Sequence, residues 1–259
     1  MTVSRIVSTH LLRNVALIFT ALALLLAVSP ANAAPRKKKV AAEAPAKLEG
    51  GLRLSPKKLK FGMSPKEVSR VYRKVIDKDY VKRYQTTEPG VQMHHLDHEV
   101  NEKKRNFARS FVEFIGLGSK FDNTPLRAEY TYNNHEALML LKRKGRTRYF
   151  FFINRKLYKT IDVYPNAGKW GDFTAASTKL DAKLTVEGRA LAPDASVGRE
   201  RAERDWATKK IHLRLIWWSK FEVALAYVDR VVEARLPELR KDRRRTKEKL
   251  DADVEEIIR

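Results

Sequence analysis

The period of the hydrophobic residues changes near residue 126, and this change restricts the fold more than any other feature of the sequence. Before it, Val68, Tyr72 and Ile76 recur at the spacing of one buried helical face. After it, apolar and polar residues alternate in short runs, as they do in strands with two different faces. We therefore predict an α+β fold, in which helices pack on an antiparallel β-meander and a hairpin.

Three helices are expected before the C-terminal segment. Residues 64–67, Ser-Pro-Lys-Glu, supply an N-cap, a proline in the first turn and the glutamate of a capping box, so the first helix begins at Pro65. The second is predicted over Asp97–Gly116, where large apolar residues line one side and a glycine ends the run. The third is predicted over 174–187, with Asp172 as its N-cap.

The predicted strands are short and closely spaced. Strand-like runs occupy Ala128–Tyr132, Ala137–Leu141, Arg148–Ile153 and Leu157–Tyr164, and later Lys210–Trp218 and Phe221–Val228. Turn residues separate them at 133–134, 144–145, 154–155 and 219–220. Connections this short predict an antiparallel meander followed by a hairpin. In the fourth run, alternation assigns Leu157, Ile161 and Val163 to one face of the sheet, and Tyr158, Thr160 and Asp162 to the other.

The globular α+β domain is expected over 61–235. Its order of helix, helix, meander, helix, hairpin would fit a degenerate internal duplication, although the two halves share no motif in detail. A basic flexible linker is predicted over 34–60, which begins with four consecutive cations at 36–39 and lacks hydrophobic periodicity. A charged C-terminal helix is predicted over 236–259, where a narrow apolar stripe recurs at helical spacing.

Residues 1–33 have the three parts of a secretory signal peptide. Arg5 and Arg13 form a positive region, 15–28 is apolar, and Ala-Asn-Ala at 31–33 matches the small-residue cleavage pattern. The apolar helix would span about 21 Å, which is less than the roughly 30 Å of a bilayer core. Cleavage is therefore expected before Ala34, and the protein is predicted to be periplasmic or secreted. An uncleaved membrane anchor is the alternative.

Composition restricts the chemistry of such an exported protein. The chain has no cysteine, so it has no disulfide, no cysteine-ligated metal, no thiol nucleophile and no lipidated cysteine. It carries 53 Lys and Arg against 31 Asp and Glu, a formal net charge of +22. A charge of this sign is typical of nucleic-acid binding, but export argues against nucleic acid as the partner. The expected partners are an envelope protein or an anionic lipid or cell-wall polymer, and the lipid alternative would involve peripheral membrane contact.

The segment 61–68, Phe-Gly-Met-Ser-Pro-Lys-Glu-Val, resembles the opening of small exported α+β domains of the SmpA/OmlA type. In that family a Gly-Met-Ser/Thr segment caps a helix that packs on a small antiparallel sheet. The family consists of envelope lipoproteins that act as non-catalytic accessories in outer-membrane protein assembly. The whole arrangement, with the aromatic strand 149–154, is also similar to that of uncharacterised exported proteins of δ-proteobacteria and myxobacteria. Both resemblances imply an exported, non-catalytic α+β module.

One run of the sequence is a candidate site for anions. Five basic residues occur within seven positions around a predicted turn, namely Lys142, Arg143, Lys144, Arg146 and Arg148. A cationic turn of this kind would contact phosphate groups or lipid headgroups. The alternative is a solvated turn whose charges protect the neighbouring aromatic strands from edge pairing.

The segment 94–99, His-His-Leu-Asp-His-Glu, is a candidate metal site. His94 and His98 would share one face of a helix, where a neighbouring acidic residue would add an oxygen ligand to zinc or a similar ion. The alternative is that Asp97 caps the second helix and the histidines lie in an exposed loop. The sequence contains neither the zinc-protease signature nor a G-x-S-x-G elbow, and no cofactor is expected.

The sequence thus predicts a non-enzymatic, exported envelope module that binds a protein partner or an anionic surface. The alternative function is a metal-dependent hydrolase that uses His94 and His98. The aromatic runs 150–152 and 217–218 are assigned to the core, with a hydrophobic binding groove as the alternative.

Overall fold

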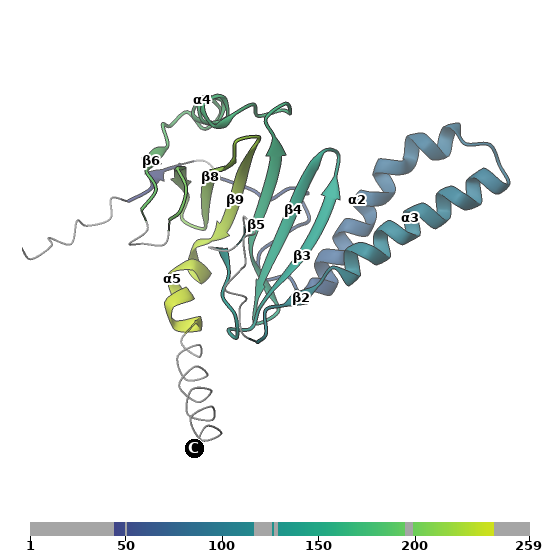
Figure 1. The fold of residues 1–259 in the computed structure, drawn as a ribbon, viewed down its shortest axis with the longest axis horizontal. Helices are drawn as coiled ribbons and strands as arrows, with labels where there is room; N and C mark the ends of the chain where they lie inside the picture. The colour runs from purple at the N-terminus through teal and green to yellow at the C-terminus, as the bar shows by residue number, and fades with distance from the viewer. Residues whose placement is uncertain (1–43, 50, 117–125, 127–128, 195–198, 241–259) are drawn as a thin grey trace, which may run out of the picture. The chain divides into compact units, whose positions relative to one another are not determined.

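The computed structural model describes residues 44–49, 51–116, 126, 129–194 and 199–240 (Figure 1). Within these residues the chain forms four helices and one nine-stranded sheet, which confirms the predicted α+β class. The helices are α2 (Pro65–Thr86), α3 (Val91–Arg109), α4 (Phe173–Leu184) and α5 (Arg230–Leu239). The strands are β1 (Ala46–Lys47), β2 (Val112–Glu113), β3 (Glu136–Arg143), β4 (Arg146–Ile153), β5 (Lys156–Pro165), β6 (Arg189–Leu191), β7 (Glu203–Ala207), β8 (Ile211–Ser219) and β9 (Glu222–Asp229).

The sheet joins two three-stranded meanders. Its strand order is β1-β7-β8-β9-β5-β4-β3-β2, and β6 also pairs with β7. Strands β3, β4 and β5 form one meander and β7, β8 and β9 form the other, and the two meet where β5 pairs with β9. All of the described strand pairs are antiparallel except β1–β7. One or two helices precede each meander, so this is the order that the predicted duplication would produce.

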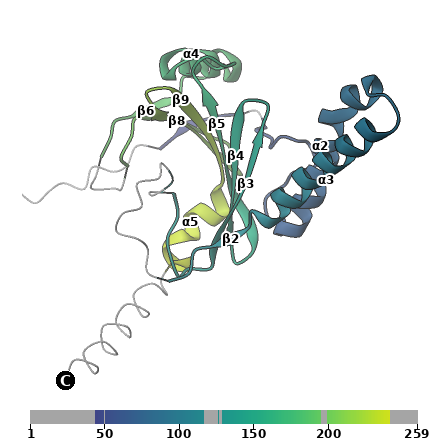
Figure 2. The same cartoon turned by 45° about the vertical axis from the view of Figure 1, so that its right-hand side comes forward.

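The two faces of the sheet carry different helices (Figure 2). On one face, Tyr72 of α2 packs edge-on against Phe150 of β4, with 5.0 Å between the ring centroids. On the other face, Phe151 belongs to the cluster against which Leu236 of α5 packs. Because Phe150 and Phe151 are neighbours in one strand, they point into opposite cores.

Helix α4 lies on the same face as α2 and α3. Its Leu180 shares a core cluster with Leu225 of β9. Leu225 lies opposite Asp162 of β5 in the register, and Asp162 accepts hydrogen bonds from Arg148, which in turn contacts the Tyr72 hydroxyl. Three helices therefore cover one face, and α5 is the described helix on the other.

The start of α2 agrees with its prediction in every detail. Ser64 is the N-cap, and its hydroxyl accepts a hydrogen bond from the Glu67 amide at 3.4 Å. The Glu67 carboxylate accepts one in return from the Ser64 amide at 2.8 Å, which completes the capping box. Val68, Tyr72 and Ile76 are buried, as the periodicity predicts.

The second and third helices differ from prediction at their ends. Helix α3 starts six residues earlier than expected, after Gly90 at φ +110°, and it ends at Arg109. It cannot continue to Gly116, because residues 112–113 pair with β3 as β2. Helix α4 has the predicted N-cap, since the Asp172 carboxylate accepts a hydrogen bond from the Ala175 amide at 2.8 Å. It ends at Leu184, three residues before the predicted end.

The meander and hairpin are confirmed, with two differences. Residues 129–132, predicted as part of a strand, are not paired in the sheet, and residue 128 lies outside the described residues. In β5 the register shifts opposite Phe151 and Phe152. This bulge returns Leu157 to the α2 face, whereas Tyr158 joins Ile161 and Val163 on the α5 face. The predicted alternation was therefore wrong for Leu157 and Tyr158.

Part of the predicted flexible linker belongs to the folded sheet and core, and its residues 34–43 lie outside the described part of the chain. Its described residues include β1, which pairs with β7, and Leu48, Leu54 and Leu59 are buried. Their apolar side chains, spaced by five or six residues, lack any period, so the pattern gave no sign of burial. The signal peptide over 1–33 lies outside the described residues, as do 241–259 of the predicted C-terminal helix. Among the helices that are described, none is long and apolar enough to cross a membrane.

Candidate functional site

The β3–β4 and β8–β9 turns lie at the same end of the sheet. Thr147 of β4 is opposite Val163 near the end of β5, and Pro165 at that end is opposite Glu222, the first residue of β9. Three strand spacings separate the two turns, which is about 14 Å. We call this surface the turn end and define it as residues 142–146, 165–170 and 217–222. It carries six basic residues and one acidic residue, Glu222.

The β3–β4 turn is held against α2 by one carboxylate. Arg143 donates to Asp79 of α2, with 2.7 Å between Nη2 and Oδ1, and Lys144 Nζ lies 2.8 Å from the same oxygen. Burial alone would raise the pKa of Asp79, but the hydrogen bonds from Arg143 and Lys144 have a larger, opposite effect, so the pKa is lowered overall. The carboxylate therefore stays ionised, and one of the two cationic charges remains uncompensated.

The other predicted cations of this turn have different surroundings. Arg148 is buried against Asp162 on the α2 face, so it is not available to a ligand. Arg146 donates to the hydroxyl of Tyr164 at 3.0 Å. Lys142 is exposed and has no ion pair within the described part of the chain. Four of the five cations of the predicted anion site thus lie at the surface, and the fifth, Arg148, is buried and does not belong to the site.

The β8–β9 turn exposes two aromatic side chains. Trp217 is 48% exposed and Phe221 is 70% exposed, whereas the adjacent Trp218 is buried. Asn166 fixes the turn, because its amide donates to the Phe221 carbonyl at 2.8 Å and its side chain donates to the Lys220 carbonyl at 2.9 Å. The assignment of 217–218 to the core is therefore wrong for Trp217, whereas all of 150–152 is buried.

The histidine cluster lies on α3 and not in a loop. His94 and His98 are one turn apart and both are exposed, as the shared helical face predicts, and Asp97 is inside the helix and not its N-cap. The neighbouring Glu99 accepts hydrogen bonds from Tyr80 and Arg83, each at 2.7 Å. Among the described residues no group of three His, Cys, Asp or Glu side chains is placed to hold a metal ion.

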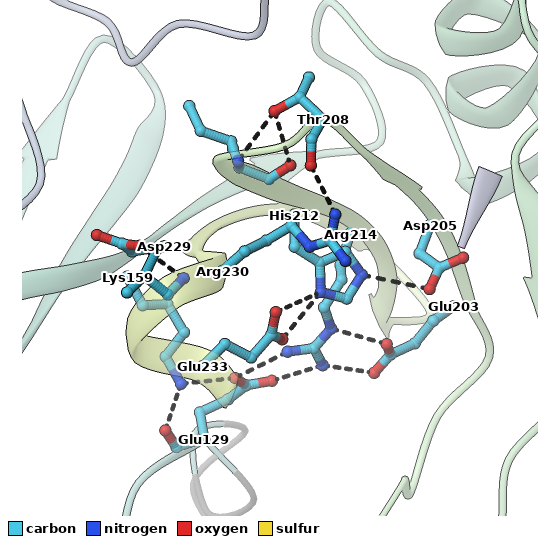
Figure 3. A network of polar contacts seen from close by, with 12 residues as sticks. Glu129, Lys159, Glu203, Asp205, Thr208, His212, Arg214, Asp229, Arg230 and Glu233 are labelled. Atoms are coloured by element: carbon cyan, nitrogen blue, oxygen red, sulfur yellow. Dashed lines mark hydrogen bonds and ion pairs between the residues drawn. The ribbon is translucent and has the colours of Figure 1, made fainter. Parts of the chain in front are cut away.

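A buried network of charges lies on the α5 face (Figure 3). Glu129 accepts from Lys159 at 2.9 Å and from Arg214 at 3.1 Å. Arg214 also donates to Glu203, with 2.8 and 2.7 Å from Nε and Nη2. Burial raises the pKa of Glu129, but the two cations lower it far more, so the net shift is strongly downward. Two cations and two carboxylates are thereby mutually neutralised inside the protein.

A histidine extends this network to α5. His212 Nε2 lies 3.2 Å from Asp205 and its Nδ1 lies 2.9 Å from Glu233 of α5. Burial lowers the pKa of His212, but the hydrogen bonds to the two carboxylates outweigh burial and raise it. Asp205 also pairs with Arg189 of β6 at 2.5 Å. Each group faces an opposite charge, so the network fastens residue 129 and α5 to the sheet, links the side chains of β6 and β7, and offers no uncommitted acid or base.

Comparison of the chain with models of known protein families, with curated proteins and with solved structures gives no significant match. The turn end and the buried network therefore stand on their geometry alone.

Sequence reasoning missed the network and the exposed tryptophan for different reasons. Lys159 and Arg214 each lie between apolar or aromatic residues of a strand, and a cation that is buried at such a position requires a carboxylate partner. The partner Glu129 comes from a segment that was assigned to a strand, so the pairing was not apparent. The exposure of Trp217 depends on where the hairpin leaves the sheet, for which the alternating pattern has no signal.

Proposed function

We propose that the protein is an exported, non-enzymatic module that binds peripherally to an anionic lipid surface through the turn end. The observation that carries the proposal is the presence of Trp217 and Phe221, both exposed, on the same end of the sheet as the cations of the β3–β4 turn. Exposure of a tryptophan or phenylalanine to water is unfavourable, and transfer of the ring into a lipid interface lowers its free energy.

The charge of the turn end supports an anionic surface over a neutral one. Lys142, Lys144, Lys169 and Lys220 are all exposed, and Asp79 offsets only one charge of the β3–β4 turn. Near an anionic membrane each Lys or Arg contributes about 1 kcal/mol of attraction, which decays within a Debye length. Aromatic insertion and cationic attraction at one end of the sheet would act together. The signal-like residues 1–33 support a compartment in which lipid headgroups are accessible.

Vesicle binding tests this proposal. The protein is purified after export, its N-terminus is established by mass spectrometry, and it is titrated with phosphatidylcholine vesicles and with vesicles that also contain phosphatidylglycerol. We expect binding to the anionic vesicles, a blue shift of tryptophan fluorescence and loss of binding at high salt. Trp217→Ser/Phe221→Ser should weaken binding by about tenfold. Lys142→Gln/Lys144→Gln/Lys220→Gln should weaken it by about two orders of magnitude at low salt.

A charge-matched control is available at the opposite end of the sheet. Lys57, Lys60 and Lys156 are exposed, and Lys156 begins β5 while the turn end adjoins its last residue. Lys57→Gln/Lys60→Gln/Lys156→Gln should change vesicle binding less than twofold beyond the general loss of charge. Equal losses in the two triple variants would contradict docking through the turn end. Binding to neither type of vesicle would leave an acidic protein surface as the better candidate partner.

A further inference from the structure

A second surface feature lies far from the turn end, where α2 begins. A groove of about 450 Å³ is open to solvent and is lined by the first turns of α2, the end of α3 with the residues that follow it, and the β4–β5 turn. Its lining consists of Pro65, Lys66, Ser69, Arg70, Arg73, Ala108, Phe111 and Arg155. Strand β5 starts next to this turn and ends at the turn end, so its ten residues place the two surfaces about 30 Å apart.

The cations of the groove have no carboxylate partners. Lys66, Arg70, Arg73 and Arg155 make no ion pair and no side-chain hydrogen bond with any described residue. Arg155 instead lies over the ring of Phe111, with 5.6 Å from its guanidinium carbon to the ring centroid. Four positive charges from two separate elements therefore converge on one hollow.

The carboxylates of α2 are all committed elsewhere. Glu67 accepts from the Ser64 amide and hydroxyl, each at 2.8 Å, which completes the cap and lowers its pKa. Asp77 pairs with Lys104 of α3, and Asp79 pairs with the β3–β4 turn. Glu67 weakens the field of Arg70, but its oxygen is directed at the N-cap. No other acidic residue of α2 lies near the groove.

The kind of cation differs between the groove and the rest of α2. Three of the four cations in the groove are arginines, whereas the further solvent-facing cations of α2 without a partner are the lysines Lys74, Lys78 and Lys82. Arginine presents a planar fork of donors that matches a phosphate or carboxylate in two-point contact, and lysine acts as a point charge. The arginines are thus concentrated where a hollow is available to receive a ligand.

The position of Arg155 is set by its hairpin. Asn154 and Arg155 form the two-residue β4–β5 connection, with φ of +49° and +58°. Both values are typical of a type I′ turn, in which the residue at the second position is usually glycine. The tight turn fixes the backbone of Arg155 at the edge of the groove, which its side chain lines. Because the turn favours glycine at this position, the backbone tolerates an Arg155→Gly substitution.

We infer that this groove is a binding site for a phosphate ester with an apolar or aromatic body. The three arginines and Lys66 would bind the phosphate oxygens, and Phe111 with the flat side of Pro65 would contact the attached organic group. A volume of about 450 Å³ accommodates one small ester or one lipid headgroup, so the same chemistry has a soluble source and a membrane source. The site does not use the turn end.

Phenyl phosphate is the probe for the soluble source. We expect saturable binding with backbone amide shifts in ¹H–¹⁵N spectra confined to 66–73, 108–111 and 155. Arg70→Gln/Arg73→Gln/Arg155→Gly should weaken this binding by about tenfold or more, because charge-assisted hydrogen bonds to the phosphate are lost. The matched control Lys74→Gln/Lys78→Gln/Lys82→Gln removes the same number of positive charges, all from the part of α2 beyond the groove, and should change the affinity less than twofold.

Each outcome decides for or against the site. Equal weakening in the two triple variants, or shifts spread along all of α2, would show diffuse attraction and overturn the inference. Absence of saturable phenyl phosphate binding by the wild-type protein would overturn it as well, unless vesicles containing phosphatidic acid shift the same amides, which would assign the lipid as the source. Thermal unfolding of the arginine variant shows whether it is folded, and the Arg155→Gly single variant, which suits the turn, repeats the test if the triple is not.

The groove and the proposed function fail separately. Loss of phenyl phosphate binding with intact docking of anionic vesicles would remove only the groove. Retained phosphate binding by the Trp217→Ser/Phe221→Ser variant, together with lost vesicle binding, would support the groove and the turn end as two independent sites.

Discussion

The buried network on the α5 face and the exposed face of α2 differ in whether their cations have carboxylate partners. Inside, Lys159 and Arg214 each contact a carboxylate within 3.1 Å. On α2, Lys66, Arg70 and Arg73 have no carboxylate contact with any described residue. The difference follows from desolvation, since an unpaired charge is costly in the interior and inexpensive in water. These uncompensated cations of α2 therefore lie where a ligand or a surface can reach them.

The largest effect is expected from breaking the buried network. Glu129→Ala would leave Lys159 and Arg214 buried with Glu203 as their remaining counterion. Loss of one partner from a buried ion pair costs about 3–5 kcal/mol, so the free energy of unfolding measured in urea should fall by that amount.

A matched control removes an exposed acid. Glu102→Ala also deletes a carboxylate that pairs with an arginine, Arg105, at 2.5 Å, but on the exposed face of α3. It should leave the midpoint of urea unfolding nearly unchanged. If Glu129→Ala and Glu102→Ala had similar effects, the contrast between buried and exposed charges would be invalid.

A smaller effect is expected at Asp79, which lies between the two classes. Its side chain is 11% exposed and it pairs with two cations of the turn end. Asp79→Asn should lower the unfolding free energy by about 1–2 kcal/mol through loss of charge-assisted hydrogen bonds. It should also raise the affinity for anionic vesicles at low salt, because Arg143 and Lys144 lose their counterion. Reduced stability with unchanged vesicle affinity would indicate that the β3–β4 turn does not face the lipid.

The parts of this fold that the sequence predicted are those controlled by local chemistry. The capping box at Ser64 and Glu67, the N-cap at Asp172 and the two-residue turns at 144–145 and 154–155 each depend on neighbouring residues, and each is confirmed. The start of α3 was mispredicted because Asp97 fits an N-cap locally, whereas the helix begins after Gly90. A single sequence shows the local N-cap signal at Asp97, but it does not show that packing favours an earlier start of the helix.

The candidate sites required the structure for a related reason. The run 142–148 was recognised as basic, but only the register shows that Arg148 points inward to Asp162 while its neighbours stay outside. The groove combines residues from 65 to 155, and the turn end combines three separate segments. Contacts between positions so far apart in the chain are fixed by packing, which composition and periodicity do not encode.

The histidine of the network predicts a modest dependence of stability on pH. Asp205 and Glu233 raise the pKa of His212 in the folded state, although burial and the charge of Arg214 oppose them. The contribution is therefore fully present below the unfolded pKa, near 6.5, and is lost as the pH rises through the folded pKa. Unfolding free energies measured from pH 6 to pH 9 should decline, with a slope of at most about 1.4 kcal/mol per pH unit.

His212→Gln isolates this dependence, because glutamine keeps a donor but does not titrate. The variant should lose the decline above pH 6.5, while the acid-side loss from Glu129, whose pKa is strongly lowered, should remain. If the unfolding free energy of His212→Gln declined with pH as steeply as that of the wild-type protein, the pH dependence would belong to another group. The contact between His212 and Glu233 of α5 would then contribute no measurable stability.

The smallest effect should have the opposite sign. Lys74, Lys78 and Lys82 follow one another at intervals of four residues, so their ammonium groups repel along the exposed face of α2. Lys78→Gln removes two of these repulsive pairs and should raise the unfolding free energy by roughly 0.2–0.5 kcal/mol per pair in low salt. The gain should vanish in high salt, because exposed charges are screened. A loss of stability would show that these lysines have partners, and then the contrast between a neutralised interior and an uncompensated α2 would not hold.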